Sequence, residues 1–427
     1  MSIERIAVVE GLRTPFIKSW TLFNDIPAQD LGVICVRELI NKTGLSPDDI
    51  DEVILGCAGQ PAEAMNIARV VSLRSGIPYT KTAFTVNRNC ASGFESLISA
   101  CEKIRCGVDK VVIAGGTESM SNIPMLFPKR MANRLLDLQK AKTVPARIKA
   151  LLKFRPADFK PIAGLRLGLM DSFCGLGMGQ TAEILAKEFA ITRAEQDAFA
   201  LDSHKKAVAA KTVLREEITP VFIPPEYKTA AEDDNGPREN QSAQALAKLK
   251  AVFERKTGTV TAGNSSQITD GSAALVVMPE TLAKSRFGNI LGCVRDYVTV
   301  GLDPSRMGLG PVFAIEALLR KNQLRLSDID LIEINEAFAV QVLASMRALA
   351  SDEFAKNHFP GAKAPGKINP EILNVNGGAI AIGHPIGSSG TRLILTCLKE
   401  MKRRGCARGL VSLCVGGGQG SAILLER

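Results

Sequence analysis

The hydrophobic and polar positions of the chain form two alternating patterns. Short runs of β-branched and other apolar residues end at glycine, and they alternate with amphipathic stretches of helical length. The clearest runs are VVIAGG at residues 111–116, AALVVM at 273–278 and GLVSLCVGGG at 409–418. Continuous apolar runs of this length indicate strands that are buried on both faces. Strands that alternate with helices predict a layered α/β architecture.

Two parts of the chain resemble each other. LSPDDIDEVILG at residues 45–56 is similar to LRLSDIDLIEIN at 324–335, and segment 85–116 is similar to segment 373–418. Each longer segment has a Val-Asn turn, a Ser-Gly helix start, and a strand that ends in glycines. The period is far too long for a solenoid, so it predicts two duplicated α/β halves. Halves that face each other bring strand-end loops to one cleft, where α/β sheets bind ligands.

We predict an N-terminal half over residues 1–284 and a C-terminal half over residues 285–427. Residues 125–250 have no counterpart in the second half, and the length of this insertion marks it as functional. Within it, segment 129–160 carries ten Lys and Arg residues and two Asp residues, a net charge of +8. Its apolar residues recur at helical spacing on both sides of Pro145, which predicts two basic amphipathic helices.

This basic segment, residues 129–160, has two interpretations. Basic amphipathic helices suit an anionic membrane surface or a partner protein. Alternatively, the apolar stripes cover the substrate pocket while the charges stay in solvent and attract phosphate groups of a ligand. The sequence leaves both interpretations open.

Composition narrows the classes of protein. The 427 residues are 46% hydrophobic and 23% charged, as in soluble globular chains. No apolar run reaches the roughly 18 to 20 residues that span a bilayer, and the start of the chain does not resemble a signal peptide, so we expect a cytoplasmic location. The ten cysteines form no CxxC pair and no zinc-type cluster, which indicates reduced thiols and no metal site. One Trp and three Tyr offer little surface for stacking bases, so we expect no nucleic acid partner.

Cys90 lies at a predicted turn between a strand and a helix, in TVNRNCASGF. Helix-terminal N–H groups near a sulfur lower its pKa from about 8.5 into the range of roughly 3.5 to 7.5, which generates a nucleophilic thiolate. We therefore expect a low pKa for the Cys90 thiol. The alternative is a small core cysteine beside a helix start.

A nucleophilic thiol requires a base, and the chain has three histidines. We expect His204 to be solvated on a helix face and His358 to lie in an irregular polar loop. His384 lies in the glycine-rich segment NGGAIAIGHPIGSSG, where backbone can approach a ligand closely. Because that segment is the repeat partner of the Cys90 turn, we expect the two to meet across the cleft. A tight connection between helix and strand is the alternative.

Two further segments carry candidate chemistry. Cys414 precedes Val415 and three glycines at the end of a buried strand, where backbone N–H groups are free to face an oxyanion. A second thiol near the first suggests proton transfer, and a core cysteine is the alternative. Asn335 and Glu336 follow the repeated IEIN strand, where they are candidates for holding a water or polarising a carbonyl; a turn-forming Asn is the alternative.

Five motifs in order resemble the thiolase family of acyl-CoA:acetyl-CoA C-acyltransferases. They are NCASG around Cys90, GNSSQITDGSAA at residues 263–274, NEAFA at 335–339, NGGAIAIGHPIGSSG at 376–390 and CVGGGQG at 414–420. The resemblance runs from residue 6 to the end of the chain. It implies the thiolase fold, in which two duplicated halves form a five-layered α/β/α/β/α core with an inserted loop domain.

The resemblance also implies roles for individual residues. Cys90 matches the acylated nucleophile, His384 the base that activates it, and Cys414 the thiol that exchanges protons with the substrate. Asn335 matches a residue that holds a water and forms one oxyanion hole with His384, while the N–H groups of Cys90 and Gly416 form the second. The residues that match the lining of the substrate and pantetheine pocket are Met178, Ser266, Met307, Ala337 and Phe338.

The implied reaction is thiolytic cleavage of a 3-ketoacyl-CoA by a ping-pong mechanism, with coenzyme A as a substrate and no cofactor. The implied assembly is a homodimer or a dimer of dimers, and the basic segment suggests a β-oxidation partner subunit or a membrane. Short-chain acetoacetyl-specific relatives carry a histidine where this chain has Gly177, so medium- or long-chain substrates in fatty-acid β-oxidation are favoured.

Three alternatives remain at this point. The first is a biosynthetic thiolase that condenses two acetyl-CoA molecules. The second is a condensing enzyme like the ketoacyl-carrier-protein synthases, which generally use two histidines and no second cysteine, so Cys414 speaks against it. The third is a scaffold that only binds acyl-CoA, which predicts loss of Cys90 or His384, and both are present.

Overall fold

The computed structural model of the protein describes residues 4–361 and 363–427 and divides into two compact units. The larger unit combines the chain up to Asn122 with Asp171–Arg427, and the smaller unit is Ile123–Met170. Residues 171–250, which the sequence analysis assigns to the insertion, therefore belong to the larger unit. The expected boundary between residues 284 and 285 falls inside helix α11 (Glu280–Phe287).

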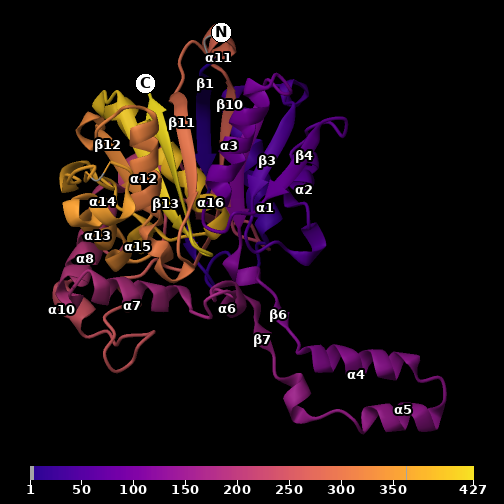
Figure 1. The fold of residues 1–427 in the computed structure, drawn as a ribbon. Coiled ribbons are helices and arrows are strands. Elements are labelled where there is room, and N and C mark those ends of the chain that lie inside the picture. The colour runs from indigo at the N-terminus through magenta and orange to yellow at the C-terminus, as the bar shows by residue number, and fades with distance from the viewer. Residues whose placement is uncertain (1–3, 362) are drawn as a thin grey trace. The chain divides into compact units, whose positions relative to one another are not determined.

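A mixed sheet of ten strands runs through the larger unit (Figure 1). Its spatial order is β12 (Leu331–Ile334), β13 (Arg408–Val415), β14 (Gln419–Glu426), β11 (Gly292–Gly301), β1 (Ile6–Arg13), β10 (Thr269–Pro279), β5 (Val112–Glu118), β3 (Glu52–Gly56) and β4 (Thr82–Val86), and β2 (Ile17–Lys18) pairs with β10. The strands on one side of the junction between β1 and β11 all belong to the N-terminal half: they are β1, β3, β4 and β5, indigo to purple in Figure 1, and β10, which is orange. The junction itself is short, because only Ile6 to Val8 pair with Gly292 to Val294.

Helices pack in three layers around the two parts of this sheet, which makes the five-layered α/β/α/β/α arrangement expected from the sequence. Helices α1 (Ala28–Thr43), α2 (Ile67–Arg74) and α11 pack on the outer face of the N-terminal strands. Helices α3 (Ser92–Arg105) and α16 (Ile386–Arg404) pack together in the middle, and α16 contacts β5 and β10 as well as β12 and β13. Helix α12 (Gly310–Lys321) covers β11, β13 and β14. Each layer has its own hydrophobic core.

The larger unit contains further helices and one further strand pair. The helices are α7 (Met178–Glu188), α8 (Arg193–Ala209), α9 (Lys211–Arg215), α10 (Ala243–Ala247), α13 (Ala339–Leu349), α14 (Asp352–His358) and α15 (Ala379–Ile382). The 3₁₀ helices are η1 (Pro47–Asp49), η2 (Ala62–Ala64), η3 (Met120–Asn122), η5 (Pro304–Leu309), η6 (Leu326–Asp328) and η7 (Pro370–Ile372), and β8 (Val221–Phe222) pairs with β9 (Ala230–Ala231).

The two halves repeat each other down to single hydrogen bonds. In the first half η1 leads into β3, which pairs in parallel with β5, and in the second half η6 leads into β12, which pairs in parallel with β13. The Asp51 carboxylate accepts from the N–H groups of Lys110 and Val111 at the start of β5, at 2.9 and 3.0 Å. The Asp330 carboxylate accepts in the same way from Ala407 and Arg408 at the start of β13. This match explains why Asp-Ile-Asp occurs in both copies.

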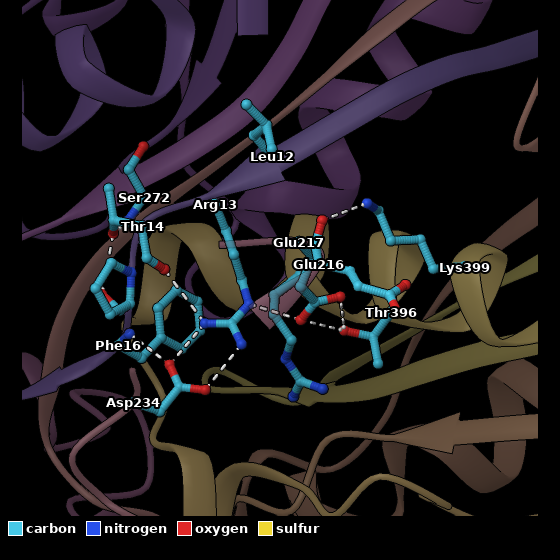
Figure 2. Close-up of polar contacts among 12 residues, drawn as sticks. Leu12, Arg13, Thr14, Phe16, Glu216, Glu217, Asp234, Ser272, Thr396 and Lys399 are labelled. Atoms are coloured by element: carbon cyan, nitrogen blue, oxygen red, sulfur yellow. Dashed lines mark hydrogen bonds and ion pairs between the residues drawn. The ribbon is translucent and has the colours of Figure 1, made fainter. Parts of the chain in front are cut away.

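A buried ion-pair cluster connects the N-terminal strand to two later parts of the chain (Figure 2). Arg13, at the end of β1, is fully buried, and its guanidinium donates through Nε to Glu217 at 2.6 Å and through both terminal nitrogens to Asp234 at 2.6 and 2.8 Å. Glu217 also accepts from the hydroxyl of Thr396 in α16. The cluster therefore fixes α16 relative to β1 and to the chain between residues 217 and 234.

The smaller unit is a helical hairpin on a two-stranded stem. Its elements are β6 (Met125–Leu126), α4 (Lys129–Lys140), α5 (Val144–Leu151), η4 (Pro156–Phe159), β7 (Ile162–Ala163) and α6 (Gly164–Gly168). Helices α4 and α5 confirm the two amphipathic helices expected from the sequence, and Pro145 lies in the first turn of α5, where its missing N–H costs nothing. Throughout the described residues, every helix is too short or too polar to cross a bilayer.

Candidate active site

The turn before α3 holds Cys90 in a constrained backbone. Asn89 adopts a left-handed conformation with φ of +46°, which Asn tolerates better than most residues. Its N–H donates to the side chain of Asn87 at 3.0 Å, and its side-chain amide donates to the carbonyl of Gly416 at 2.8 Å. The turn that presents Cys90 is thus bonded to the loop between β13 and β14.

The expectation of a low pKa for Cys90 is wrong for this structure. Burial removes water from the sulfur and raises the pKa of the Cys90 thiol, and the hydrogen bonds from Gly416 and from its own N–H only partly oppose this; the negative charge of Glu118 adds to the rise. The first N–H groups of the helix do not reach the sulfur, because Ala91 and Ser92 donate to the carbonyls of Arg88 and Asn89. The resting residue is therefore a neutral thiol.

His384 has a defined tautomer. Ser389 donates its hydroxyl to the carbonyl of Pro385 at 2.8 Å, so its oxygen, 2.6 Å from Nδ1 of His384, accepts the Nδ1 hydrogen. This leaves Nε2 as the basic nitrogen, and the amide nitrogen of Asn335 lies 3.4 Å from it. Burial, with a smaller contribution from the charge of Arg392, lowers the pKa of His384 to about 4. His384 is a neutral base at neutral pH.

The Cys90 and His384 segments are brought together by two interlocked helices. Cys90 lies two residues before α3 and His384 two residues before α16. A Cβ added to Gly93 would lie 2.6 Å from the backbone nitrogen of Thr391, and one added to Gly390 would lie 2.7 Å from that of Phe94. The first turns of the helices therefore touch backbone to backbone, as the repeat relation between the two segments predicts.

The other two histidines lie in places that the sequence analysis did not foresee. His204 was expected in solvent, but it is buried, and its Nδ1 accepts from the backbone N–H of Arg238 at 3.2 Å. Chain that folds over α8 covers it, and this burial lowers the pKa of His204 to about 4. His358 was expected in an irregular loop, but it is the last residue of α14, with its ring 4.2 Å from that of Phe354. It lines a groove of about 810 Å³ that includes none of the predicted site residues.

Asn335 and Glu336 follow β12 and have different roles. The Oδ1 atom of Asn335 is buried without a hydrogen-bond partner among the described residues, which suits an acceptor for a bound water. The Glu336 carboxylate accepts from Ser203 at 2.6 Å and from Asn374 at 2.9 Å, so it holds the glycine-rich segment. A Cβ on Gly378 would overlap that carboxyl group at 2.2 Å, which requires glycine there.

Cys414 and Gly416 complete the site from the C-terminal half. Cys414 is the residue before the last of β13, and burial, with a further contribution from Cys90, raises the pKa of its thiol. The Asn89 amide, next to Cys90, donates to the carbonyl of Gly416, two residues after Cys414, so the two thiols belong to one site. The N–H of Gly416 opposes the rise in the pKa of Cys90. A Cβ on Gly416 would meet the sulfur of Met178 at 3.3 Å, so Met178 borders the same space.

The residues predicted to line the substrate pocket pack in one region of the larger unit. Ser266 donates its backbone N–H to the carbonyl of Ala337 at 3.0 Å, and Ser265 bridges to Phe338. Ala337, Phe338 and Met307 belong to the same hydrophobic core as Cys414, and Met178 packs against it. The sequence analysis missed three residues of this site, namely Asn89, Glu118 and Ser389. Asn before the cysteine in a turn was the one available signal, because the other two act only through contacts between distant segments.

Comparisons with known proteins agree with this geometry. The family model "Thiolase, N-terminal domain" matches residues 6–281 and "Thiolase, C-terminal domain" matches residues 288–427. The 3-ketoacyl-CoA thiolase of Pseudoalteromonas translucida is 42% identical over 427 residues, covering 99% of this chain and 97% of the relative, and that of Escherichia coli O127:H6 is 40% identical over 426 residues with the same coverage.

Solved structures give the same result. The Bacillus anthracis acetyl-CoA acetyltransferase superposes with a TM-score of 0.87 at 34% identity, covering 99% of both chains. Human mitochondrial 3-ketoacyl-CoA thiolase in complex with CoA superposes with a TM-score of 0.85 at 34% identity, covering 99% of this chain and 98% of that chain.

Proposed function

Because the chain belongs to the thiolase family, we propose that it is an acyltransferase that cleaves a 3-ketoacyl-CoA with CoA, giving acetyl-CoA and a shortened acyl-CoA. The observation that carries the proposal is a pair of thiols, Cys90 and Cys414, whose segments are joined by the hydrogen bond from the Asn89 amide to the carbonyl of Gly416 at 2.8 Å. A reaction that forms a thioester and also protonates a carbanion needs two such groups. One becomes the ester, and the other supplies the proton.

In the first half-reaction His384 accepts the proton of Cys90 at Nε2, and the sulfur attacks the 3-keto carbon. The carbonyl oxygen becomes an alkoxide, which N–H groups aimed at it stabilise in a site without bulk water. Collapse of this alkoxide breaks the C2–C3 bond and expels the enolate of acetyl-CoA. Cys414 gives its proton to C2 of the enolate, and the acyl group remains on Cys90.

The second half-reaction transfers the acyl group. The Cys414 thiolate accepts the proton of the incoming CoA thiol, and the CoA sulfur attacks the thioester carbonyl. Cys90 leaves and regains its proton from the His384 imidazolium, so both thiols return to their starting state. We assign one oxyanion hole to His384 with a water held by Asn335, and the other to the N–H groups of Cys90 and Gly416.

The pocket wall of Met178, Ser266, Met307, Ala337 and Phe338 is proposed to hold the pantetheine and the acyl chain. Gly177 caps the start of α7 without a side chain, in support of medium- or long-chain substrates from fatty-acid β-oxidation over acetoacetyl-CoA. Rates across 3-ketoacyl-CoA lengths decide this point. A biosynthetic thiolase is supported instead if only acetoacetyl-CoA is turned over.

The test of the proposed chemistry is the site of acylation. Incubation with acetyl-CoA alone should leave a thioester on the peptide that contains Cys90, detected by mass spectrometry. Cys90→Ser should lose the adduct and lower kcat by at least ~10³-fold, because a neutral hydroxyl is a far weaker nucleophile than a thiol. An adduct on another cysteine, with full activity in the variant, overturns the assignment.

We further propose that the hairpin of α4 and α5 docks on an anionic lipid surface. Leu135, Ile148, Leu151 and Leu152 are about half or more exposed, whereas Met131 is buried and Leu138 is half-buried, so part of the apolar stripe remains uncovered. Among the described residues, the only cations of segment 129–160 that form ion pairs are Arg130, Arg134 and Lys153, with Asp158 and Asp137, which leaves most of its cations free to meet phosphate groups. Each basic residue near such a surface contributes roughly 1 kcal/mol. A partner protein is the competing occupant.

The assembly is also a proposal, a homodimer or a dimer of dimers. β4 supports it, since this strand is the edge of the ten-stranded sheet and has half-buried to exposed side chains. An open strand edge pairs readily with another chain. Light scattering on the purified protein measures the assembly.

A further inference from the structure

Glu118 is a buried carboxylate at the point where the two halves of the chain meet. It is the last residue of β5, and its side chain is fully buried. Its Oε2 accepts from the N–H groups of Ala58 at 2.9 Å and Gly387 at 2.8 Å. Its Oε1 accepts from the N–H of Gly59 at 2.9 Å and from the thiol of Cys57 at 3.5 Å.

These contacts favour the ionised form: burial raises the pKa of Glu118, and the hydrogen bonds that it accepts from Ala58, Gly59, Gly387 and Cys57 oppose this rise. All four partners donate to Glu118, and the described structure gives its oxygens no acceptor for a proton of their own. Gly387 is the second residue of α16, so the negative charge also lies at the positive end of a 19-residue helix. Among the described residues no Lys, Arg or His forms an ion pair with Glu118, so the backbone donors alone balance its charge. Such a charge acts on nearby groups more strongly than a paired one.

Glu118 controls the start of α16. Gly387 lies three residues after His384 and two before Ser389, which fixes the imidazole. The backbones are in contact at the same place, since a Cβ on Gly116 would lie 1.9 Å from the carbonyl of Gly387. The carboxylate therefore ties the His384 segment to β5 and, through Ala58 and Gly59, to the chain that follows β3.

The charge of Glu118 also acts on nearby thiols. The carboxylate accepts from the Cys57 thiol at 3.5 Å and raises the pKa of Cys57. It also raises the pKa of the Cys90 thiol, as a smaller contribution beside burial.

We propose that Glu118 is a positioning residue for thiolysis, whose carboxylate fixes the start of α16, with His384 and Ser389, against β5 and the chain that follows β3. The proposal rests on the proposed function, and it goes beyond it by assigning the placement of the base to a residue outside the groups that take part in the reaction. In support, the charge of Glu118 favours a protonated Cys90, and a protonated thiol resists alkylation and oxidation between turnovers because the thiolate is the reactive form.

The test compares Glu118→Gln with Asp270→Asn, which removes another buried carboxylate, bonded to Ser19 and Ser121, from the neighbouring strand. The first readout is the pH dependence of Cys90 alkylation by iodoacetamide without substrate, followed on the Cys90 peptide. We expect the midpoint of Glu118→Gln to fall by roughly half a unit to one unit and that of Asp270→Asn to stay at the wild-type value. This readout does not require thiolysis, so it stays informative if the proposed function fails.

The second readout is steady-state thiolysis. We expect Glu118→Gln to lower kcat roughly tenfold or more, with KM for CoA within about twofold of the wild type, because a misplaced base slows chemistry and not binding. Glu118→Asp keeps the charge but shortens the side chain, so its alkylation midpoint should stay near the wild type while kcat falls; it also carries the test if the Gln variant does not fold. An unmoved midpoint in Glu118→Gln, or full activity in Glu118→Asp, overturns the proposal.

Discussion

At the residue scale, the two groups that exchange a proton, Cys90 and His384, are both neutral in the resting site. Burial raises the pKa of Cys90 and lowers that of His384, so both shifts oppose a thiolate–imidazolium pair before substrate arrives. The sequence alone predicted that Cys90 and His384 meet, but it predicted a lowered pKa for the thiol, whereas the structure raises it. A helix start near a cysteine is visible in a sequence, whereas the water removed from the sulfur depends on how both halves close around it.

The lowered pKa of His384 predicts the acid limit of activity. A protonated imidazole cannot accept the Cys90 proton, so kcat/KM should fall only as pH approaches about 4, well below the ordinary histidine value of 6.5. His204 also has a folded-state pKa of about 4, so unfolding takes up protons between about pH 6.5 and 4, and stability is complete above this window and falls through it. The measurement is a pH profile of kcat/KM together with the unfolding midpoint at each pH.

His204→Gln is the control for that profile. It should reduce the loss of stability with acid by up to roughly 1.4 kcal/mol per pH unit within the window, while the limb of kcat/KM stays in place. An acid limb near pH 6.5 in the wild type would contradict the burial argument for His384.

At the element scale, the sequence predicted the strands of the sheet better than the contacts that connect distant segments of the chain. The three apolar runs form β5, β10 and β13. The two Asp-Ile-Asp copies precede the equivalent strands β3 and β12. Periodicity carries this information because it is local. The Arg13 cluster joins segments about two hundred residues apart, and the contact that buries His204 joins segments about thirty residues apart. A local pattern in the sequence cannot predict such distant partners.

The Arg13 cluster predicts a large effect of one substitution. Arg13→Met leaves Glu217 and Asp234 buried without their cation, which should cost roughly 3–5 kcal/mol of unfolding free energy. Arg215→Met is the matched control, because its ion pair with Asp233 is exposed to solvent and its loss should have a much smaller effect on the unfolding free energy. Urea unfolding of the two variants compares them directly, and equal losses would show that the buried pairs add nothing.

At the scale of the whole molecule, two units with different surfaces share one chain. The larger unit holds every residue assigned to catalysis, and segment 129–160, which contains α4 and α5, has a net charge of +8 and a partly uncovered apolar stripe. Because the two units are separate, substitutions in the hairpin should remove surface binding without removing catalysis.

Replacing Lys140, Lys142, Lys149 and Lys153 with Gln should therefore abolish binding to vesicles that contain anionic lipid, while turnover of a short 3-ketoacyl-CoA stays nearly unchanged. Wild-type binding should weaken with salt, because the attraction is electrostatic. Co-sedimentation with anionic and neutral vesicles measures this binding. The charge control replaces four Lys residues of the larger unit with Gln, at Lys187, Lys211, Lys284 and Lys321. If wild-type protein ignores the vesicles and the hairpin variant has a raised KM for CoA, the hairpin is an electrostatic lid instead.

The position of β14 has a consequence for biosynthesis. This strand, Gln419–Glu426, lies inside the sheet between β13 and β11 and pairs with both along its whole length. A chain without this strand leaves β11 and β13 with open, apolar edges, which invite aggregation and proteolysis. Because β11 and β13 both precede β14 along the chain, these edges stay open during synthesis until β14 has been made and has joined them. A nascent chain at that stage is a target for chaperones and proteases.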